Sequence, residues 1–372
     1  MTEMGLSAIW YDKPNKWEIV ELPVHSPEPD EIVIRVRATG ICGSDLHITR
    51  GDGRDENSPE RGPLVFGHEM TGTVHKLGSK VKTDSLKIPL NEGDRVIFPY
   101  FFPCMSCYNC IKGELGACKF RLRRPYQDWK VCNSGYSQYF VLRAPHFIFH
   151  SPESLEDDAL VSLNCALAQV VEAFNVSKIN FGDNIVIQGA GALGIYATAV
   201  ARNMGANEII VIDGHESRLN MAKECGASQV INILDYPDAE KRIDAVREIT
   251  KGIGADIVME LVGFPSVIEE GLKMVRTRGK YLEIGSVSQN TNITVDANYL
   301  MKTQIRLLSF QHYDPWIIPK CAEFLERTKS IYPLTSLVSH KFSLENINEA
   351  FEKSDWLGKN ADSTLTRAII EP

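Results

Sequence analysis

One segment constrains the fold more than any other: two strand patterns flank a glycine-rich turn and a helix pattern. The apolar run Asn184–Gln188 leads into Gly-Ala-Gly-Ala-Leu-Gly at residues 189–194, the helical pattern continues to Met204, and a second apolar run, Glu208–Asp213, follows. This order predicts a βαβ unit with parallel strands.

The same alternation continues further along the chain. Helix patterns at residues 239–252 and 265–275 each precede a strand pattern, at 256–260 and 280–284. Strands alternating with helices predict an α/β fold with a doubly wound parallel sheet. The earlier part differs, because short runs such as Trp17–Val20 and Glu31–Val36 are typical of half-buried antiparallel strands, and the polar stretch Gly51–Gly62 is typical of a solvated loop.

The glycine-rich turn is the first candidate site. Gly189 and Gly191 permit a tight turn and a close approach of the backbone to a ligand, while Gly194 permits close packing of the helix on the strand. Free amides at the start of that helix can hold a pyrophosphate. The alternative is a glycine turn without nucleotide. Strand, helix and a following acid together favour a dinucleotide site comprising Gly189, Gly191, Leu193, Gly194, Asp213 and Arg218.

The acid in this set also indicates which cofactor is used. Asp213 ends the second strand, 19 residues after Gly194, where a ribose hydroxyl would lie. Its carboxylate can accept a hydrogen bond from the ribose 2′-hydroxyl but would repel a 2′-phosphate, so we expect NAD rather than NADP. Arg218 can stack or pair near the adenosine ribose.

Four cysteines form a second candidate site. Cys104, Cys107, Cys110 and Cys118 lie within fifteen residues, and four thiolates on short loops close a tetrahedron around a structural zinc ion. Free thiols, a redox pair and an iron–sulfur cluster are the alternatives. The seven-residue gap before Cys118 and the absence of other cluster motifs favour zinc.

Charge and hydropathy exclude several classes of protein. The chain of 372 residues has 40 basic and 48 acidic side chains, a net charge of −8, which argues against nucleic acid and anionic membranes as partners. Apolar runs stay well short of the roughly 18 residues of a membrane span, and the start has no signal-peptide pattern. Nine cysteines with a thiolate cluster indicate a reducing compartment, so we expect a cytoplasmic protein.

The sequence resembles the zinc-dependent medium-chain alcohol dehydrogenases along essentially its whole length. The resemblance is carried by Gly40–His47 (Gly-Ile-Cys-Gly-Ser-Asp-Leu-His), Gly67-His68-Glu69, the four-cysteine segment, Cys165 and Gly189–Asp213. It implies two zinc ions per chain, one catalytic and one structural, together with NAD. Cys42, His68 and Cys165 match the catalytic zinc ligands. Glu69 matches a nearby carboxylate that can approach the metal, and Asp45 matches the acid that orients the ligating histidine.

The resemblance also implies a reaction and a pocket. Zinc would lower the pKa of an alcohol, NAD would accept hydride, and Ser44 with His47 would carry the proton away. Tyr100 and Tyr136 match pocket positions, and their bulk favours an apolar, secondary or cyclic alcohol over a small polyol. Phe310 and residues 313–316 are expected to close the pocket near a domain hinge. The polar stretch 51–62 makes the gap between Cys42 and His68 longer than is usual in the family.

The implied architecture has a Rossmann nucleotide-binding domain, residues 167–309, inserted into a catalytic domain. The latter comprises residues 1–166 and 310–372, a GroES-like, partly open β-barrel with the structural zinc lobe at 99–120. Family members are dimers or tetramers. The alternatives are an aldehyde or ketone reductase, a polyol dehydrogenase, a non-catalytic nucleotide-binding scaffold and a nucleic-acid zinc module. The metal-ligand pattern disfavours the scaffold, and the acidic balance disfavours the nucleic-acid module.

Overall fold

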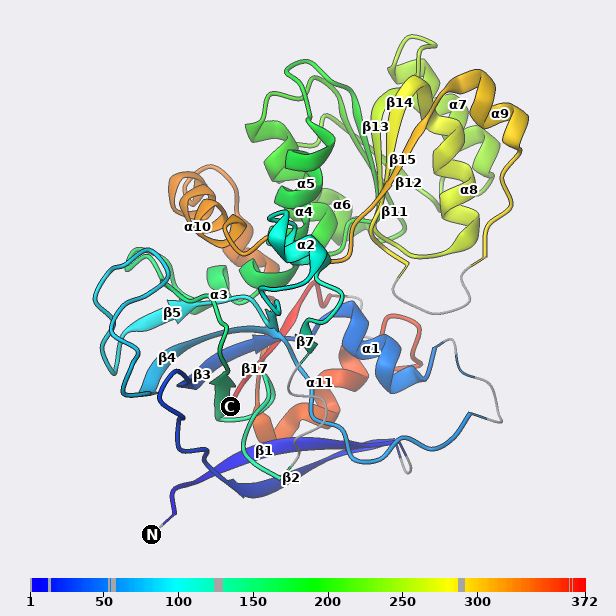
Figure 1. Cartoon of the computed structure of the whole chain (residues 1–372). Helices are drawn as coiled ribbons and strands as arrows, with labels where there is room; N and C mark the ends of the chain where they lie inside the picture. Colours follow the sequence, from blue (N-terminus) through cyan, green and yellow to red (C-terminus); the bar gives the residue numbers. More distant parts are fainter. Residues whose placement is uncertain are drawn as a thin grey trace.

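The structure, a computed structural model, describes residues 2–12, 15–52, 54, 58–123, 130–286, 292–360, 362 and 364–372. Two large sheets form two halves of the molecule, with the parallel sheet in one half and the sheet that contains β3, β4 and β17 in the other (Figure 1). Both chain ends lie in the second half (Figure 1).

The parallel sheet has six strands in the order β12-β11-β10-β13-β14-β15, and every pair in it is parallel. Its strands are β10 (Ile185–Gln188), β11 (Ile209–Asp213), β12 (Gln229–Asn232), β13 (Ala255–Glu260), β14 (Val275–Glu283) and β15 (Arg306–Ser309). The strand order reverses beside β10, which is the point where such sheets bind ligands. The predicted doubly wound sheet is confirmed.

Helices cover both faces of this sheet. They include α5 (Ala192–Asn203), α6 (Glu216–Glu224), α7 (Ala239–Ile249), α8 (Pro265–Met274) and α9 (Ala297–Thr303). Successive side chains of a strand point to opposite faces, so Ile185 and Ile187 pack with α5 while Val186 packs with α7 and α8. Burial on both faces explains the continuous apolar runs of these strands.

The second large sheet has seven strands. The order β16-β17-β3-β4-β5-β9 is joined by β8, which pairs with β3, and all pairs except β16 with β17 are antiparallel. The strands are β3 (Ile32–Gly40), β4 (Glu69–Leu77), β5 (Arg95–Ile97), β8 (Tyr139–Leu142), β9 (Phe149–His150), β16 (His340–Ser343) and β17 (Ala368–Glu371). Two hairpin-like pairs accompany it: β1 (Met4–Tyr11) with β2 (Lys16–Pro23), and β6 (Phe101–Phe102) with β7 (Leu122–Arg123).

The remaining helices connect the two halves or lie beside the second sheet. They are α1 (Gly43–Arg50), α2 (Tyr108–Ile111), α3 (Asp157–Leu160), α4 (Ala168–Ser177), α10 (Ile317–Thr328) and α11 (Ile347–Ser354), with short turns η1 (Leu115–Ala117), η3 (Leu334–Leu337) and η4 (Leu344–Asn346). The chain passes from the seven-stranded sheet into the parallel sheet and then returns to the seven-stranded sheet with β16 and β17. The predicted fold class, a nucleotide-binding domain inserted into the other, is confirmed; the boundaries at 166 and 310 stay a prediction.

A five-residue π-helix, η2 (Leu163–Leu167), lies between α3 and α4. The run Asp157–Ser177 that contains it is the one described helical segment long and apolar enough to span a membrane, and it is mostly buried inside the protein, as expected of a core helix.

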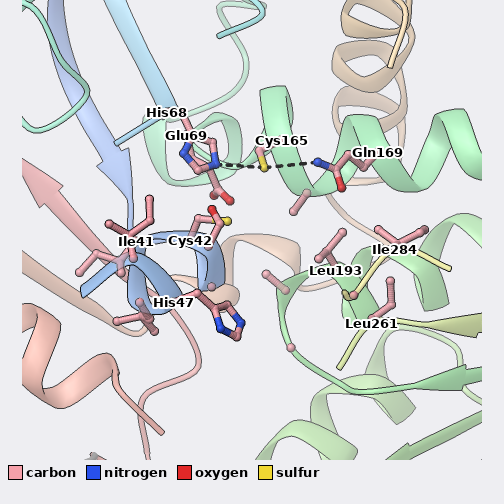
Figure 2. A pocket seen from close by; sticks show the side chains of 18 of the residues that line it. Ile41, Cys42, His47, His68, Glu69, Cys165, Gln169, Leu193, Leu261 and Ile284 are labelled. Carbon is pink, nitrogen blue, oxygen red and sulfur yellow. Dashed lines mark hydrogen bonds between the residues drawn. The ribbon is translucent and has the colours of Figure 1, made fainter. Parts of the chain in front are cut away.

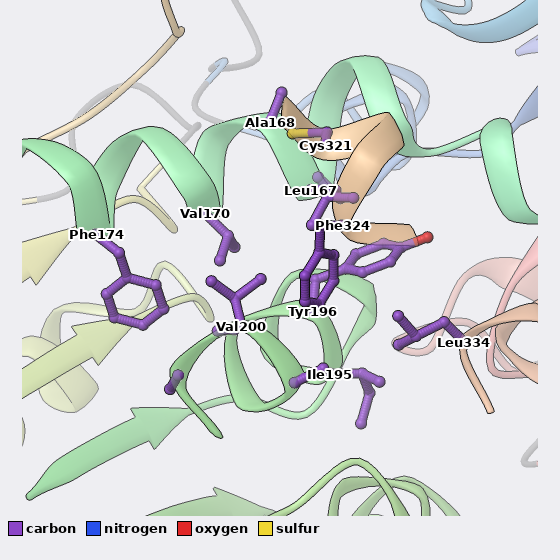
Figure 3. Close-up of a cluster of buried hydrophobic side chains, with 14 of the residues drawn as sticks. Leu167, Ala168, Val170, Phe174, Ile195, Tyr196, Val200, Cys321, Phe324 and Leu334 are labelled. Atoms are coloured by element: carbon purple, nitrogen blue, oxygen red, sulfur yellow. The ribbon is translucent and has the colours of Figure 1, made fainter. Parts of the chain in front are cut away.

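The largest hydrophobic cluster joins this helical segment to the nucleotide half. Leu167, Val170 and Phe174 pack against Tyr196 and Val200 of α5, and α10 closes the cluster from another side (Figure 3). Each such side chain contributes about 1.5–3 kcal/mol on burial. The cluster therefore fixes η2 relative to the glycine-rich turn at the start of α5.

Candidate active site and metal centres

Three segments distant in sequence bring four metal-ligating side chains together. Cys42 follows β3 and precedes α1, His68 and Glu69 lie at the start of β4, and Cys165 lies in the π-helix η2. One ligand atom from each of the four lies within 4.8 Å of all the others, and Cys165 Sγ is 3.4 Å from His68 Nε2 (Figure 2). The structure thus assembles the predicted catalytic-zinc residues.

Asp45 connects two of these segments. Its carboxylate accepts a hydrogen bond from the Cys42 amide (3.1 Å) at the start of α1, and its other oxygen lies 3.5 Å from His68 Nδ1. The side chain is fully buried. A carboxylate on the far nitrogen of a histidine fixes the ring so that Nε2 points to the metal. This geometry fits the orienting role that the resemblance implied for Asp45.

The electrostatics of the site favour an ionised sulfur. The hydrogen bond from Cys165, and then the positive charges of His68 and Arg367, hold the pKa of the Cys42 thiol well below its usual range. Contact with Cys42 and burial raise the pKa of Cys165 well above its usual range. Burial opposes protonation of His68, but the charges of Asp45 and Cys42 outweigh it and raise the pKa of the imidazole.

Glu69 is buried beside these donors and forms an ion pair with Arg367, which precedes β17. Oε2 is the oxygen that faces Arg367, whereas Oε1 is buried without a hydrogen-bond partner among the described residues. A buried polar atom in that condition is costly unless a hydrogen-bond donor or a metal ion accompanies it. The set of two thiols, an imidazole and this carboxylate fits Zn²⁺, because two cysteines and one histidine leave one position of the tetrahedron open.

The four-cysteine lobe has the geometry of a closed metal site. Its Sγ–Sγ distances are 3.5 Å for Cys107–Cys110, 3.8 Å for Cys107–Cys118 and 4.0 Å for Cys104–Cys110. Zn–S bonds of about 2.3 Å in a tetrahedron separate sulfurs by about 3.7 Å. An amide hydrogen bond from Ser106 lowers the pKa of Cys104 to about 6, and burial raises the pKa of Cys110 to about 12.

The lobe contacts the wall of the active-site cavity. The Gly116 amide donates to Asp314 Oδ1 (2.8 Å), and Arg121 donates to Gln311 Oε1 (2.8 Å). A Cβ at Gly116 would lie 2.7 Å from the Tyr313 carbonyl oxygen, so glycine permits this close approach. The four cysteines therefore support the segment that leads from β15 to α10.

One cavity of about 1150 Å³ contains both the metal donors and the glycine-rich turn. All the predicted nucleotide-site residues line it: Gly189, Gly191, Leu193, Gly194, Asp213 and Arg218. A Cβ on Gly194 would lie 1.9 Å from the Gly189 carbonyl oxygen, whereas a Cβ on Gly191 would meet open space. The turn therefore fits a pyrophosphate, since Gly194 seats the helix and Gly191 leaves its backbone open to the cavity.

Asp213 is held in place by the backbone. Its carboxylate accepts hydrogen bonds from the Ala190 amide (2.7 Å) and the His215 amide (2.8 Å) at the end of β11.

Glu260 and Glu283 lie side by side at the ends of β13 and β14, and Glu283 lines the cavity. Burial and the neighbouring Glu283 raise the pKa of Glu260 to about 7.

The structure corrects part of the predicted substrate pocket. Tyr100 lines the cavity, with its ring centroid 4.7 Å from that of His68. Tyr136 does not line it: the side chain is fully buried against Trp17, and its hydroxyl donates to Asp45 Oδ2 (2.7 Å). The Tyr136 prediction was wrong because the hydroxyl has a buried acceptor and the ring has an aromatic cluster to fill.

The predicted hinge residues are corrected in the same way. Phe310 lines the cavity, but residues 313–316 do not, and Gln311 and His312 take their place. Tyr313 is fully buried and donates its hydroxyl to the Asn164 carbonyl, while Trp316 faces outward under the ammonium of Lys320. Ser44 and His47, the predicted proton path, both line the cavity from α1.

Sequence reasoning missed many cavity residues, and five of them bear on the chemistry of the site: Asp52, Gln169, His312, Trp356 and Arg367. Gln169 lies one helical turn after Cys165 and donates weakly to its sulfur (3.9 Å), a contact drawn in Figure 2. Arg367, a charge directly before the buried strand β17, was the one detectable signal among them. The other four belong to segments without a motif.

The polar stretch 51–62 contributes to the cavity rim, although residues 53 and 55–57 lie outside the described part. Arg54 and Arg61 line the cavity and both form ion pairs with Asp12, at 2.8 and 3.4 Å. The loop was expected to be solvated, but the Asp12 carboxylate, directly after β1, holds two of its guanidinium groups in place.

The chain is similar to known dehydrogenases along most of its length. Residues 28–153 match the alcohol dehydrogenase GroES-like domain, and residues 192–328 match the zinc-binding dehydrogenase domain. The sorbitol dehydrogenase of Bacillus subtilis is 32% identical over 342 residues, covering 91% of this chain and 90% of the relative. The 5-exo-hydroxycamphor dehydrogenase of Pseudomonas putida is 29% identical over 341 residues, covering 91% and 92%. Among solved structures, an alcohol dehydrogenase from Thermotoga maritima superposes with a TM-score of 0.88 at 25% identity, covering 100% of both chains.

Proposed function

Because the chain belongs to the zinc-dependent medium-chain alcohol dehydrogenase family and is an alcohol oxidoreductase, we propose that it transfers hydride between a secondary or cyclic alcohol and NAD. One observation carries the proposal: the Cys42, His68 and Cys165 donors and the glycine-rich turn of α5 open into one cavity. Metal and dinucleotide would therefore meet at the substrate.

The donor geometry supports the proposed metal-ligand assignment. Cys42, His68 and Cys165 would hold the catalytic zinc, with Glu69 able to approach it, and Cys104, Cys107, Cys110 and Cys118 would hold the structural one. When bound, zinc supplies Lewis acidity toward the alcohol oxygen and NAD supplies the hydride acceptor. Asp45 keeps His68 oriented, and Arg367 holds Glu69 by its charge.

A proton must leave the alcohol as hydride departs. Ser44 and His47 are the first and last groups of the proposed path, both on α1 and both lining the cavity. Ser44 passes the hydroxyl proton on, and the imidazole of His47 accepts it nearer to solvent, where its side chain is 20% exposed.

Asp213 supports NAD rather than NADP. Its carboxylate is oriented by two backbone amides and lines the cavity beyond the glycine-rich turn. A negative charge at this place attracts the ribose 2′-hydroxyl and repels a 2′-phosphate. Arg218 lines the same end and is positioned to contact the adenosine.

The substrate class is argued from the aromatic cavity wall. Tyr100, Phe310 and Trp356 line the cavity, with Tyr100 beside His68, and flat apolar rings favour a cyclic or secondary alcohol. His312 and Gln169 line the same region, so a polyol is the competing substrate class. The reverse reaction, reduction of an aldehyde or ketone, would use the same residues.

The wider description of the protein is also part of the proposal. Residues 1–166 with 310–372 would form the catalytic domain and residues 167–309 the NAD-binding domain. The resemblance favours a dimer or tetramer, and the nine cysteines with a thiolate cluster favour the cytoplasm. The net charge of −8 favours small-molecule partners over nucleic acid or membranes.

The test is NADH absorbance after mixing zinc-loaded protein and NAD with cyclic, secondary, primary and polyhydric alcohols, repeated with NADP. Turnover of cyclic or secondary alcohols with NAD supports the proposal, and turnover of polyols alone replaces its substrate class. Ser44→Ala is expected to lose most turnover while keeping two zinc ions. If the wild type binds two zinc ions but turns over none of these alcohols, the result favours the non-catalytic scaffold.

A further inference from the structure

The proposed proton path has a continuation beyond His47 that the sequence did not reveal. His47 Nδ1 lies 2.5 Å from Asp52 Oδ2, and both side chains line the cavity. The Asp52 side chain is 32% exposed and that of His47 20% exposed. The pair therefore lies between the interior of the cavity and bulk water.

The end of α1 explains why Asp52 reaches back to His47. Gly51 has φ 73° and caps the helix, with its amide donating to the Ile48 carbonyl (3.1 Å). The Asp52 amide then donates to the His47 carbonyl (3.1 Å). The left-handed glycine reverses the chain, so backbone and side chain of Asp52 both contact His47.

A second segment holds Asp52 from the other side. Arg50 Nε is 3.2 Å from Asp52 Oδ2, and Arg50 Nη1 donates to Asp355 Oδ1 (3.0 Å) just after α11. The Arg50 guanidinium carbon lies 4.7 Å from the ring centroid of Trp356. The Trp356 ring also packs at a right angle to that of His47, with 6.2 Å between the two ring centroids. Asp52 is thus fixed by contacts from both ends of the sequence.

We propose that Asp52 is a positioning residue that keeps the His47 proton on Nδ1 and thereby presents the Nε2 lone pair to the proton path. The inference rests on the proposed function, because His47 must accept a proton for it to matter. In alcohol oxidation the O–H bond breaks and an N–H bond forms at Nε2 of His47. The imidazolium, paired with Asp52, then releases one proton to water, which restores the neutral ring.

The charges that face His47 determine the effect of removing Asp52. The carboxylate oxygen is 2.5 Å from Nδ1, while the Arg50 Nη2 cation is 3.5 Å from the same atom and Asp355 acts only through Arg50. The carboxylate is therefore the nearer of the two groups and the one that can accept a hydrogen bond from Nδ1–H. Without it, the Nδ1 proton loses this acceptor while the Arg50 cation stays nearby.

The test compares Asp52→Asn with Asp355→Asn, a matched control that removes the charge of the other carboxylate on Arg50. The amide oxygen of the control can still accept the Arg50 hydrogen bond, so the support of Asp52 is kept. For Asp52→Asn we expect kcat of alcohol oxidation to fall about 10- to 100-fold, with KM for NAD and zinc content unchanged. The control is expected to keep kcat.

Nitrogen NMR of the histidine side chains in the zinc-loaded protein gives a readout that does not depend on turnover. The Nδ1–H signature of His47 is expected in the wild type and in Asp355→Asn and to weaken in Asp52→Asn. In a His47→Gln background, Asp52→Asn should cost nothing further. An unchanged kcat or an unchanged Nδ1–H signature in Asp52→Asn, or loss of zinc from that variant, would overturn the inference. A wild type that is silent with all alcohols overturns the proposed function instead, and this inference with it.

Discussion

The two cysteine-containing donor sets contrast in how the chain builds them. The structural set takes four thiols from one stretch of fifteen residues, three of them with two residues between each, in short turns and the four-residue helix α2. The catalytic set takes its donors from the turn between β3 and α1, the start of β4 and η2, separated by 26 and 97 residues, and His68, Glu69 and Cys165 are buried.

One donor set is therefore assembled by local chain geometry and the other by the whole fold. Turns can bring the four thiols together without the rest of the molecule, so metal binding there is largely local folding. The catalytic donors meet only if the seven-stranded sheet pairs in register and the core cluster fixes η2. The first set should therefore respond to mutation as a stability element, and the second as a reporter of the whole fold.

The largest expected effect is on activity. Cys42→Ser removes the thiolate at the N-cap of α1 and should leave one zinc ion per chain in the lobe, while turnover falls at least about a thousandfold, since the Lewis acid supplies several kcal/mol. Zinc analysis with NADH absorbance checks this. Cys132→Ser, a buried cysteine outside both sets, is the control and should keep two zinc ions. Two zinc ions in Cys42→Ser would disprove the ligand assignment.

The second prediction concerns stability. Cys107→Ser opens the structural set, and because that metal site contributes folding energy, we expect the melting temperature to fall by roughly 5–10 °C. Activity measured at 20 °C should fall far less than in Cys42→Ser, although the lobe supports the wall at Asp314 and Gln311. Complete loss of activity in a folded Cys107→Ser protein with its catalytic zinc present would show that the two sets are not independent.

A smaller effect is expected at a residue that supports the catalytic set from outside. Tyr136→Phe removes the hydroxyl that donates to Asp45 Oδ2, while the Cys42 amide still binds that oxygen. Because Asp45 orients His68, zinc affinity should fall about tenfold. Competition with a chelator measures it. Tyr139→Phe, whose hydroxyl binds Glu3 near the surface, is the matched control with unchanged affinity.

The smallest effect is a pH dependence where the lobe meets the cavity wall. Burial, and then the charge of Asp314, raise the pKa of Glu172 to about 7, against an ordinary value of 4.5. Between these values the folded state holds one more proton than the unfolded state, so stability should fall as pH rises toward 7 and level off above it.

Glu172→Gln should remove this contribution and flatten the fall in melting temperature between pH 5 and 8 by roughly 2 °C. Glu260 contributes in the same direction from the other half, so the difference between the wild type and the variant isolates Glu172. A melting curve series checks it, and identical pH profiles would contradict the assignment.

Much of the fold could be predicted from the sequence because its signals are local. Apolar runs and glycines predict the strand, turn and helix at 184–213, and the structure has β10, α5 and β11 there. The cysteine spacing likewise predicted that the four thiols lie together. Both patterns depend on neighbours within a few residues.

The cavity wall could not be predicted in the same way. Tyr136 was assigned to it by the family resemblance and Tyr313 as part of an aromatic stretch near the hinge. Buried hydrogen-bond acceptors at Asp45 and Asn164 instead hold both side chains in the core. Asp52 was overlooked inside a polar stretch, because only the reversal at Gly51 turns its carboxylate to His47. Such contacts depend on how segments distant in sequence pack together, and a local sequence pattern does not predict that packing.

The π-helix η2 makes one short part of this protein sensitive to insertions and deletions. An α-helix turns about 100° per residue, so deleting one residue between Leu163 and Leu167 would rotate Cys165 away from His68, or else move Val170 and Phe174 out of their core positions. The chain cannot satisfy both at the shorter length. In sequence alignments, a gap within these five residues should therefore mark a protein with a different third ligand or none.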